Sequence, residues 1–327
     1  MLADMKDSLR AAWLRATRSD IEVPLTGYAQ TKLSWARRVD SFDALPDVYR
    51  DRLKALLGDR PLPHAVLTPT YPGFMRQENE KLILSLDQQI YIWERLKGDL
   101  NCARYALEDI HSTEMGMVLL QSWIKISGIA REGVLATTTL KFNSVTDSLF
   151  APFIDQIRGA AGDLADADRE AEIRTLDSRV QSNFKFRNYA RRSLMPGEKI
   201  IDALWQPEIR NKLLTLLGRS FFRTIAMTHL LILTERELIV IREDETSPRW
   251  RDESRYGGIW TYIPLDKITS VSLVPKETKL LALVIHLPEN DSLESWFVAS
   301  QQLAVDRFLS QIESRTSRAA TGRALLP

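Results

Sequence analysis

The chain is poor in the residues that disulfide bridges, metal clusters and catalytic centres most often use. It has one cysteine, Cys102, among 327 residues, which excludes an intrachain disulfide and a cysteine-based metal cluster. Its four histidines are scattered over separate predicted strands, and no two are spaced to place a pair of metal ligands on one face. We therefore expect structural histidines, no metal site and no cofactor.

The chain also lacks an excess charge and a long hydrophobic run. Its 44 basic and 43 acidic side chains leave a net charge of +1, so any electrostatic partner must be met by a local patch. No stretch approaches the roughly 20 apolar residues of a transmembrane helix. Charges at Asp4, Lys6, Asp7 and Arg10 interrupt the apolar run that a signal peptide needs. We expect a cytoplasmic protein that binds no nucleic acid.

Short motifs that carry known chemistry are missing from the sequence. There is no G-x-G-x-x-G, no G-x-x-x-x-G-K-[ST], no H-E-x-x-H and no G-x-S-x-G. The acidic run at Asp163, Asp166 and Asp168 lacks the glycine and the distal glutamate of a calcium loop. We therefore expect a protein that is not an enzyme.

The sequence contains an internal duplication. Residues 82–92, LILSLDQQIYI, are similar in sequence to residues 231–241, LILTERELIVI, at an offset of 149. Each pattern predicts a hairpin. Later in each copy, apolar residues at i, i+1, i+4, i+5 and i+8 from Leu149 and from Ala304 form matching helical stripes, offset by 155. Paired hairpins followed by paired helices indicate two copies of one unit.

Alternation of apolar and polar residues predicts seven strands and one closing helix in each copy. In the first copy the strands are expected at 64–69, 80–86, 89–95, 102–107, 110–116, 119–127 and 134–142, with a helix at 145–158. In the second copy they are expected at 199–205, 222–233, 236–242, 259–264, 268–274, 279–287 and 293–299, with a helix at 300–315. Short strands joined by short turns predict an antiparallel meander closed by an amphipathic helix.

The second copy resembles a known family. The run LLILTERELIVI at 230–241, followed by a polar loop and YIPLDKITSVSL at 262–273, is similar to the bacterial PH-like and GRAM-type domains. The resemblance is clearer in 196–314 than in 62–158, where Ala106 replaces the proline. It implies mostly β (α+β) architecture, with two seven-stranded, bent antiparallel barrels each capped by a C-terminal helix. It also implies binding or scaffolding rather than catalysis.

The remaining segments are predicted to be helical. Apolar spacing over 2–16 predicts an amphipathic helix, and proline before glycine predicts another from Pro46 to Leu57 that ends at Gly58. A charged helix with Ile173, Leu176, Val180 and Phe184 on one side predicts a semi-rigid linker. The expected division is an N-terminal helical extension, a first unit, a helical linker, a second unit and a flexible tail, at 1–60, 61–158, 159–194, 195–315 and 316–327.

A basic insertion distinguishes the second copy from the first. Residues 208–223, EIRNKLLTLLGRSFFR, carry Arg210, Lys212, Arg219 and Arg223 against Glu208, a local net charge of +3. Interleaved leucines and phenylalanines give the composition of an interfacial membrane segment. Alternatively, these apolar residues pack on the barrel while the bases are solvated.

A second basic run lies in the linker, at 184–192. Lys185, Arg187, Arg191 and Arg192 alternate with aromatic residues and no acid is present. Such a run can bind anionic lipid or single-stranded nucleic acid. It can equally be a helix end whose arginines complement the helix dipole and whose aromatic residues are buried.

Three functional hypotheses follow. The first is a non-enzymatic tandem PH-like scaffold that binds a partner protein or a second copy of itself. The second is a peripheral protein at the inner face of the membrane, held to anionic lipid by 208–223. The third is an enzyme with a site between the two units, which would require a pocket of converging carboxylates or histidines.

Overall fold

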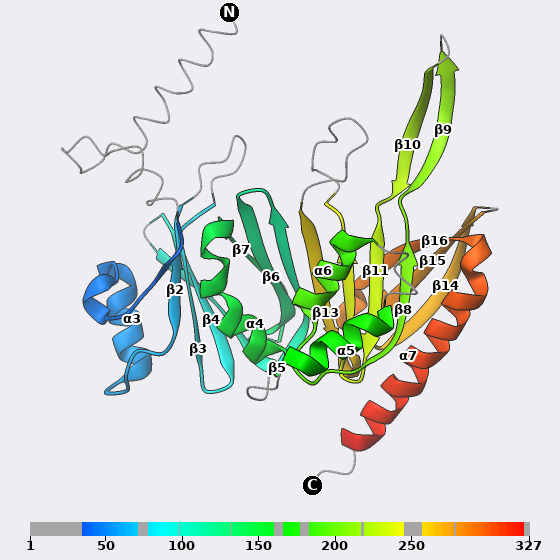
Figure 1. Cartoon of the computed structure of the whole chain (residues 1–327). Helices are drawn as coiled ribbons and strands as arrows, with labels where there is room; N and C mark the ends of the chain where they lie inside the picture. Colours follow the sequence, from blue (N-terminus) through cyan, green and yellow to red (C-terminus); the bar gives the residue numbers. More distant parts are fainter. Residues whose placement is uncertain are drawn as a thin grey trace, which may run out of the picture.

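The computed structural model describes residues 35–70, 78–97, 99–131, 133–159, 166–176, 183–216, 219–244, 257–277 and 279–323 (Figure 1). The helix expected at 2–16 lies outside these residues. Seven strands fall in the first half: β1 Arg37–Arg38, β2 Ala65–Thr68, β3 Lys81–Leu86, β4 Gln89–Leu96, β5 Asp99–Val118, β6 Gln121–Ala130 and β7 Leu135–Asn143. The second half contains β8 Ile200–Gln206, β9 Ile209–Leu216, β10 Arg219–Ala226, β11 His229–Thr234, β12 Glu237–Arg242, β13 Gly258–Pro264, β14 Ser270–Glu277, β15 Leu280–His286 and β16 Ser292–Val298.

Helices close and connect the strands. The α-helices are α3 Asp47–Leu57, α4 Ala151–Ile157, α5 Asp166–Leu176, α6 Phe184–Ser193 and α7 Gln302–Arg323. The 3-10 helices are η1 Phe42–Ala44, η2 Ser144–Leu149, η3 Leu265–Lys267, η4 Pro288–Asn290 and η5 Ala299–Gln301. The helix predicted between Pro46 and Gly58 is confirmed: Pro46 is its N-cap, and Gly58 ends it with a positive φ of 58°.

One sheet of 11 strands runs through both halves of the chain. Its order is β1-β2-β3-β4-β5-β13-β12-β11-β8, and β6 pairs with β5 and β7. The long strand β5 makes this possible, because residues 99–106 pair with β4 and residues 113–117 pair with β13. The strands predicted at 102–107 and 110–116 are therefore a single strand. The two predicted barrels are not confirmed, since the described sheets are open.

The second half differs from the first where β13 ends. Pro264 has no N–H to continue a strand ladder, and η3 follows it, so β14, β15 and β16 form a separate three-stranded sheet. In the first half Ala106 stands at the matching position and β5 continues without a break. The mostly β, antiparallel prediction with a C-terminal helix is thus confirmed.

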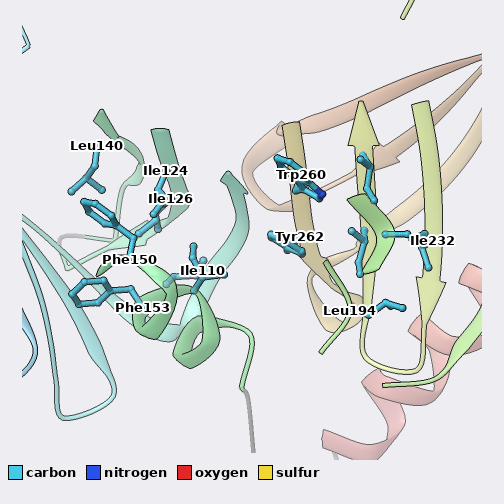
Figure 2. Packing of buried hydrophobic residues seen from close by; sticks show 14 of the residues in the cluster. Ile110, Ile124, Ile126, Leu140, Phe150, Phe153, Leu194, Ile232, Trp260 and Tyr262 are labelled. Carbon is cyan, nitrogen blue, oxygen red and sulfur yellow. The ribbon is translucent and has the colours of Figure 1, made fainter. Parts of the chain in front are cut away.

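Successive side chains of each strand point to opposite faces of the large sheet, and each face is covered by an apolar core. On β11, Leu230 and Ile232 belong to a core that spans both halves under α4, α5 and α6, which we call the shared core. Figure 2 shows residues of this core from both halves, among them Phe150, Ile232 and Trp260. On the opposite face, Leu231 and Leu233 pack under β14–β16 and α7.

The opposite face of the first half is covered by α3. Leu53 and Leu57 of this helix are buried together with Leu82 and Leu84 of β3. The sheet is therefore a central layer. Helices of the middle segment cover one face, and a different element covers each half of the other face.

The segment between the halves is packed rather than extended. Of the four apolar residues predicted to share one side of the linker helix, Ile173 and Leu176 are buried in the shared core, and Val180 lies outside the described residues. Phe184 is 73% exposed, and Phe186 is buried instead. A new helix starts at Asn183, whose side chain accepts from the Phe186 N–H, so the apolar stripe of α5 does not continue in phase.

Candidate functional site

The basic insertion forms a two-stranded ribbon that projects from the large sheet. Strands β9 and β10 pair only with each other among the described strands, and they continue β8 and β11 outward (Figure 1). The strand predicted at 222–233 is therefore two strands, β10 and β11, with a break at 227–228. The ribbon does not lie on the sheet, so its exposed side chains at Asn211, Lys212, Phe222 and Arg223 are available to a partner.

The ribbon has little internal support. Two register shifts, between Phe221 and Phe222 and between Thr224 and Ala226, interrupt its ladder. Among the ribbon side chains that the structure describes, Ile209 is buried, but none belongs to one of the three cores. Isolated two-stranded hairpins are marginally stable in water, and such an element gains stability when a further surface covers it.

Three of the four predicted ribbon bases have described side chains. Arg210 pairs with Glu208 at 2.7 Å, and Thr224 donates to the other oxygen of the same carboxylate at 2.7 Å. Lys212 and Arg223 are exposed, and Lys212 lies opposite Phe222, which is 55% exposed. The side chain of Arg219 lies outside the described part. The ribbon thus presents cations and an apolar ring together.

The second basic run begins at the base of the ribbon. Lys185 of α6 pairs with Glu243 at 2.6 Å, and the Glu243 N–H donates to the Thr228 carbonyl, which lies between β10 and β11. At the other end of α6, Arg192 lies 3.6 Å from Asp147 of η2. Arg187 and Arg191 are half-buried and also have partners. The structure therefore brings the start of the second basic run to the base of the ribbon, whereas the other end of α6 lies against η2 of the first half.

Helix α6 is seated there by glycine. A Cβ at Gly258 would stand 2.6 Å from the ring of Tyr189, so only glycine lets this ring lie over the start of β13. The Trp260 indole N–H also donates to the Tyr189 carbonyl at 3.2 Å.

A pocket of about 310 Å³ lies where the two halves meet. Its floor is apolar, with Met115 of β5 and Trp260 of β13 among its residues. Two carboxylates, Asp147 and Asp155, and two guanidinium groups, Arg158 and Arg192, also line it. The pocket meets only part of what the third hypothesis requires, which is an enzyme site between the two units. It brings carboxylates together, but no histidine is among its lining residues, and Asp147 is paired with Arg192.

Arg158, which lines this pocket, also joins the two halves. It follows α4 of the first half, and its Nε donates to Glu237 of β12 at 3.0 Å, while Nη2 donates to the Ser193 carbonyl at 2.7 Å. Glu198 lies 3.6 Å away, and the guanidinium stacks 4.0 Å from the ring centre of Tyr262. Burial raises the pKa of Glu237 to about 7, although Arg158 opposes this shift.

The histidines occupy separate surroundings. His229 is buried, its Nδ1 lies 2.8 Å from the Met227 carbonyl, and burial lowers its pKa to about 4. His286 lies 3.0 Å from the hydroxyl of Ser272, and His64 lies 2.9 Å from the Leu149 carbonyl. Across the described residues, no three metal-ligating side chains gather. Nor is any described helix both long and apolar enough to cross a membrane.

Sequence reasoning missed Arg158 and its acidic partners. A charged residue at the end of an amphipathic helix is expected to be exposed to solvent. The same holds for Glu237, which lies in a hairpin rich in charged residues. Their pairing depends on the contact between halves, and no local pattern reports that contact.

Neither protein-family models nor curated proteins give a match.

Proposed function

We propose that this chain is a non-enzymatic binding protein that attaches to anionic membrane surfaces through the ribbon β9–β10. The observation that carries the proposal is that the ribbon projects from the sheet and does not pack on it (Figure 1). The competing interpretation required its apolar residues to be buried against the body of the protein.

The composition of the ribbon favours a lipid surface. Its sequence places six leucine and phenylalanine residues among four bases and one acid. Apolar residues beside cations suit the boundary between head groups and acyl chains, because each meets its preferred surroundings there. A strand pair whose outer edges are unpaired among the described strands also gains from being covered.

The arrangement of the second half is consistent with the resemblance to PH-like and GRAM-type domains. Four strands, β8, β11, β12 and β13, are followed by three strands, β14 to β16, and then by α7. In this interpretation the ribbon is an extension of the first hairpin of the domain. The first half repeats the order of strands and closing helix, so we propose a tandem scaffold.

Vesicle sedimentation tests the proposal. We expect the full chain to sediment with vesicles that contain phosphatidylserine, to sediment less with phosphatidylcholine alone, and to dissociate as salt rises. Each base near an anionic surface contributes about 1 kcal/mol, so the Lys212→Glu/Arg223→Glu variant should bind at least about 10-fold more weakly.

The matched control is Arg52→Glu/Lys54→Glu, which makes the same change of charge at two exposed bases of α3. Equal losses in both variants would show that only net charge matters and would overturn the role of the ribbon. No sedimentation of the wild-type chain with any vesicle would reject the membrane and favour a protein partner.

A further inference from the structure

A second exposed apolar site lies at the turn between β5 and β6. Leu119 and Leu120 are each 64% exposed, and Val145, which follows β7, is 58% exposed. Ser144 ties them together, because its N–H donates to the Leu120 carbonyl at 3.0 Å and its hydroxyl donates to the Leu119 carbonyl at 2.9 Å. We call these three apolar residues the turn site.

The turn site is unfavourable for an isolated molecule in water. Two-residue hairpin turns are normally built from glycine, asparagine or aspartate, and here leucine occupies both positions. Leu119 adopts a positive φ of 54°, which is an unusual conformation for a bulky side chain. Leucine at these two positions favours neither the formation of the turn nor its solvation by water. Contact of the turn with an apolar phase would explain why leucine is found there.

The strand register places the turn site and the ribbon at the same edge of the large sheet. One row of paired residues crosses five strands, through Gln206, His229, Arg242, Ile259 and Gly116. The ribbon leaves the sheet just beyond Gln206 and His229, and the turn site lies just beyond Gly116. The interstrand spacing puts β11 and β5 roughly 15 Å apart along this edge.

The basic helix α6 starts beside the ribbon and crosses the face of the sheet away from this edge, because the Ser193 carbonyl at its end accepts from Arg158, which pairs with Glu237 at the other end of β12. It begins at Lys185, whose partner Glu243 lies beside the base of the ribbon. Exposed Phe184 adds an apolar side chain at the start of the helix. The start of α6, with Phe184 and Lys185, therefore adds one apolar side chain and one base to the edge that carries the ribbon and the turn site.

We propose that the turn site is a second membrane-inserting element, which enters the same anionic bilayer as the ribbon. This inference rests on the proposed function. A lipid surface fits better than a protein groove because apolar tips and cations occur together along one edge, as the interface of an anionic bilayer requires. The ribbon extends further than the rest of the sheet (Figure 1), so both elements reach one plane when the sheet is inclined to the membrane.

A matched pair of valines gives the sharpest test. Val145 belongs to the turn site, whereas Val134 is 60% exposed in the turn after β6, at the opposite edge of the same sheet. We expect Val145→Ser to weaken sedimentation with phosphatidylserine vesicles about threefold and Val134→Ser to leave it unchanged. The Leu119→Asn/Leu120→Ser variant should weaken it about 10-fold, and asparagine is compatible with the positive φ.

Circular dichroism and thermal unfolding establish that each variant is folded before vesicles are added. If wild type binds vesicles and the turn-site variants bind as well as Val134→Ser, the second element is rejected and the ribbon proposal stands. If wild type does not bind at all, the proposed function itself fails. Equal weakening by Val134→Ser and Val145→Ser would also overturn the inference, because it would show no preference for one edge.

Discussion

At the scale of single residues, the buried ion pair between Arg158 and Glu237 links the two halves. Both side chains are at most 6% exposed, and Glu198 and Tyr262 lie against the same guanidinium. Buried pairs of this kind contribute little net stability, but removing one partner leaves a costly unpaired charge. We infer that the pair sets the relative position of α4 and β12 rather than supplying most of the stability.

Glu237 makes the stability of the protein depend on pH. Burial raises its pKa from 4.5 to about 7, so the folded state holds this proton more tightly than the unfolded state does. Its contribution is fully present below pH 4.5 and is lost as pH rises through about 7. Relative to Glu237→Gln, the wild-type free energy of unfolding should fall by about 1–3 kcal/mol between pH 5 and 8. Urea denaturation at several pH values measures this, and parallel pH curves for the two proteins would contradict it.

At the scale of elements, the local pattern was sufficient for most strands. Short apolar runs bounded by polar residues placed β3, β4, β12 and β13 within one residue of their observed ends, because a strand buried on both faces is apolar along most of its length. The pattern also placed α3 between its proline and its glycine. It failed at β5, where two predicted strands are one, since the break after Pro264 has no counterpart at Ala106.

The candidate site was only partly predictable for the same reason. Composition singled out the bases of 208–223, but the apolar residues beside them fit a packed segment and a projecting ribbon equally well. Pairing between β5 and β13 joins residues more than 140 positions apart, and no local pattern encodes it. The shared edge of the ribbon and the turn site follows from that pairing.

The ribbon should be separable from the fold. Gln206 and His229 are directly paired, so a two-residue Asn-Gly turn can replace residues 207–228 and close β8 onto β11. Because no described side chain of this segment belongs to one of the three cores, the free energy of unfolding should change by less than about 1 kcal/mol. Vesicle binding should be lost. Chemical denaturation and sedimentation of the same variant test both parts, and a large loss of stability would mean that the ribbon packs on the body.

At the scale of the whole molecule, the two halves share one sheet and one core, so we expect them to unfold together. The large sheet crosses from one half to the other at β5 and β13, and the shared core contains residues of both. Helix α6 packs on β12 and β13 beside this seam, and α5 packs on α6 and β8. Unfolding of either half therefore exposes apolar surface of the other, which couples their stabilities.

A substitution that destabilises one half should accordingly destabilise the other half as well. Ile232 of β11 is fully buried in the shared core, and Ile232→Ala should cost about 2–5 kcal/mol. Amide hydrogen exchange should then accelerate in β3 and β4 as well as in β11. Exchange that changes only in the second half would show that the halves unfold independently.

The central claim is that the ribbon itself touches the membrane, and a probe on the ribbon tests it most directly. The only cysteine of the chain is Cys102, so a Cys102→Ser background allows a polarity-sensitive fluorophore to be placed at Asn211→Cys, an exposed ribbon position. Val134→Cys, at the opposite edge, is the control. The emission of the ribbon probe should shift to the blue on vesicles containing phosphatidylserine, should return when salt is added, and should not shift on phosphatidylcholine. An unchanged spectrum at Asn211→Cys while the protein sediments with the vesicles would contradict the account.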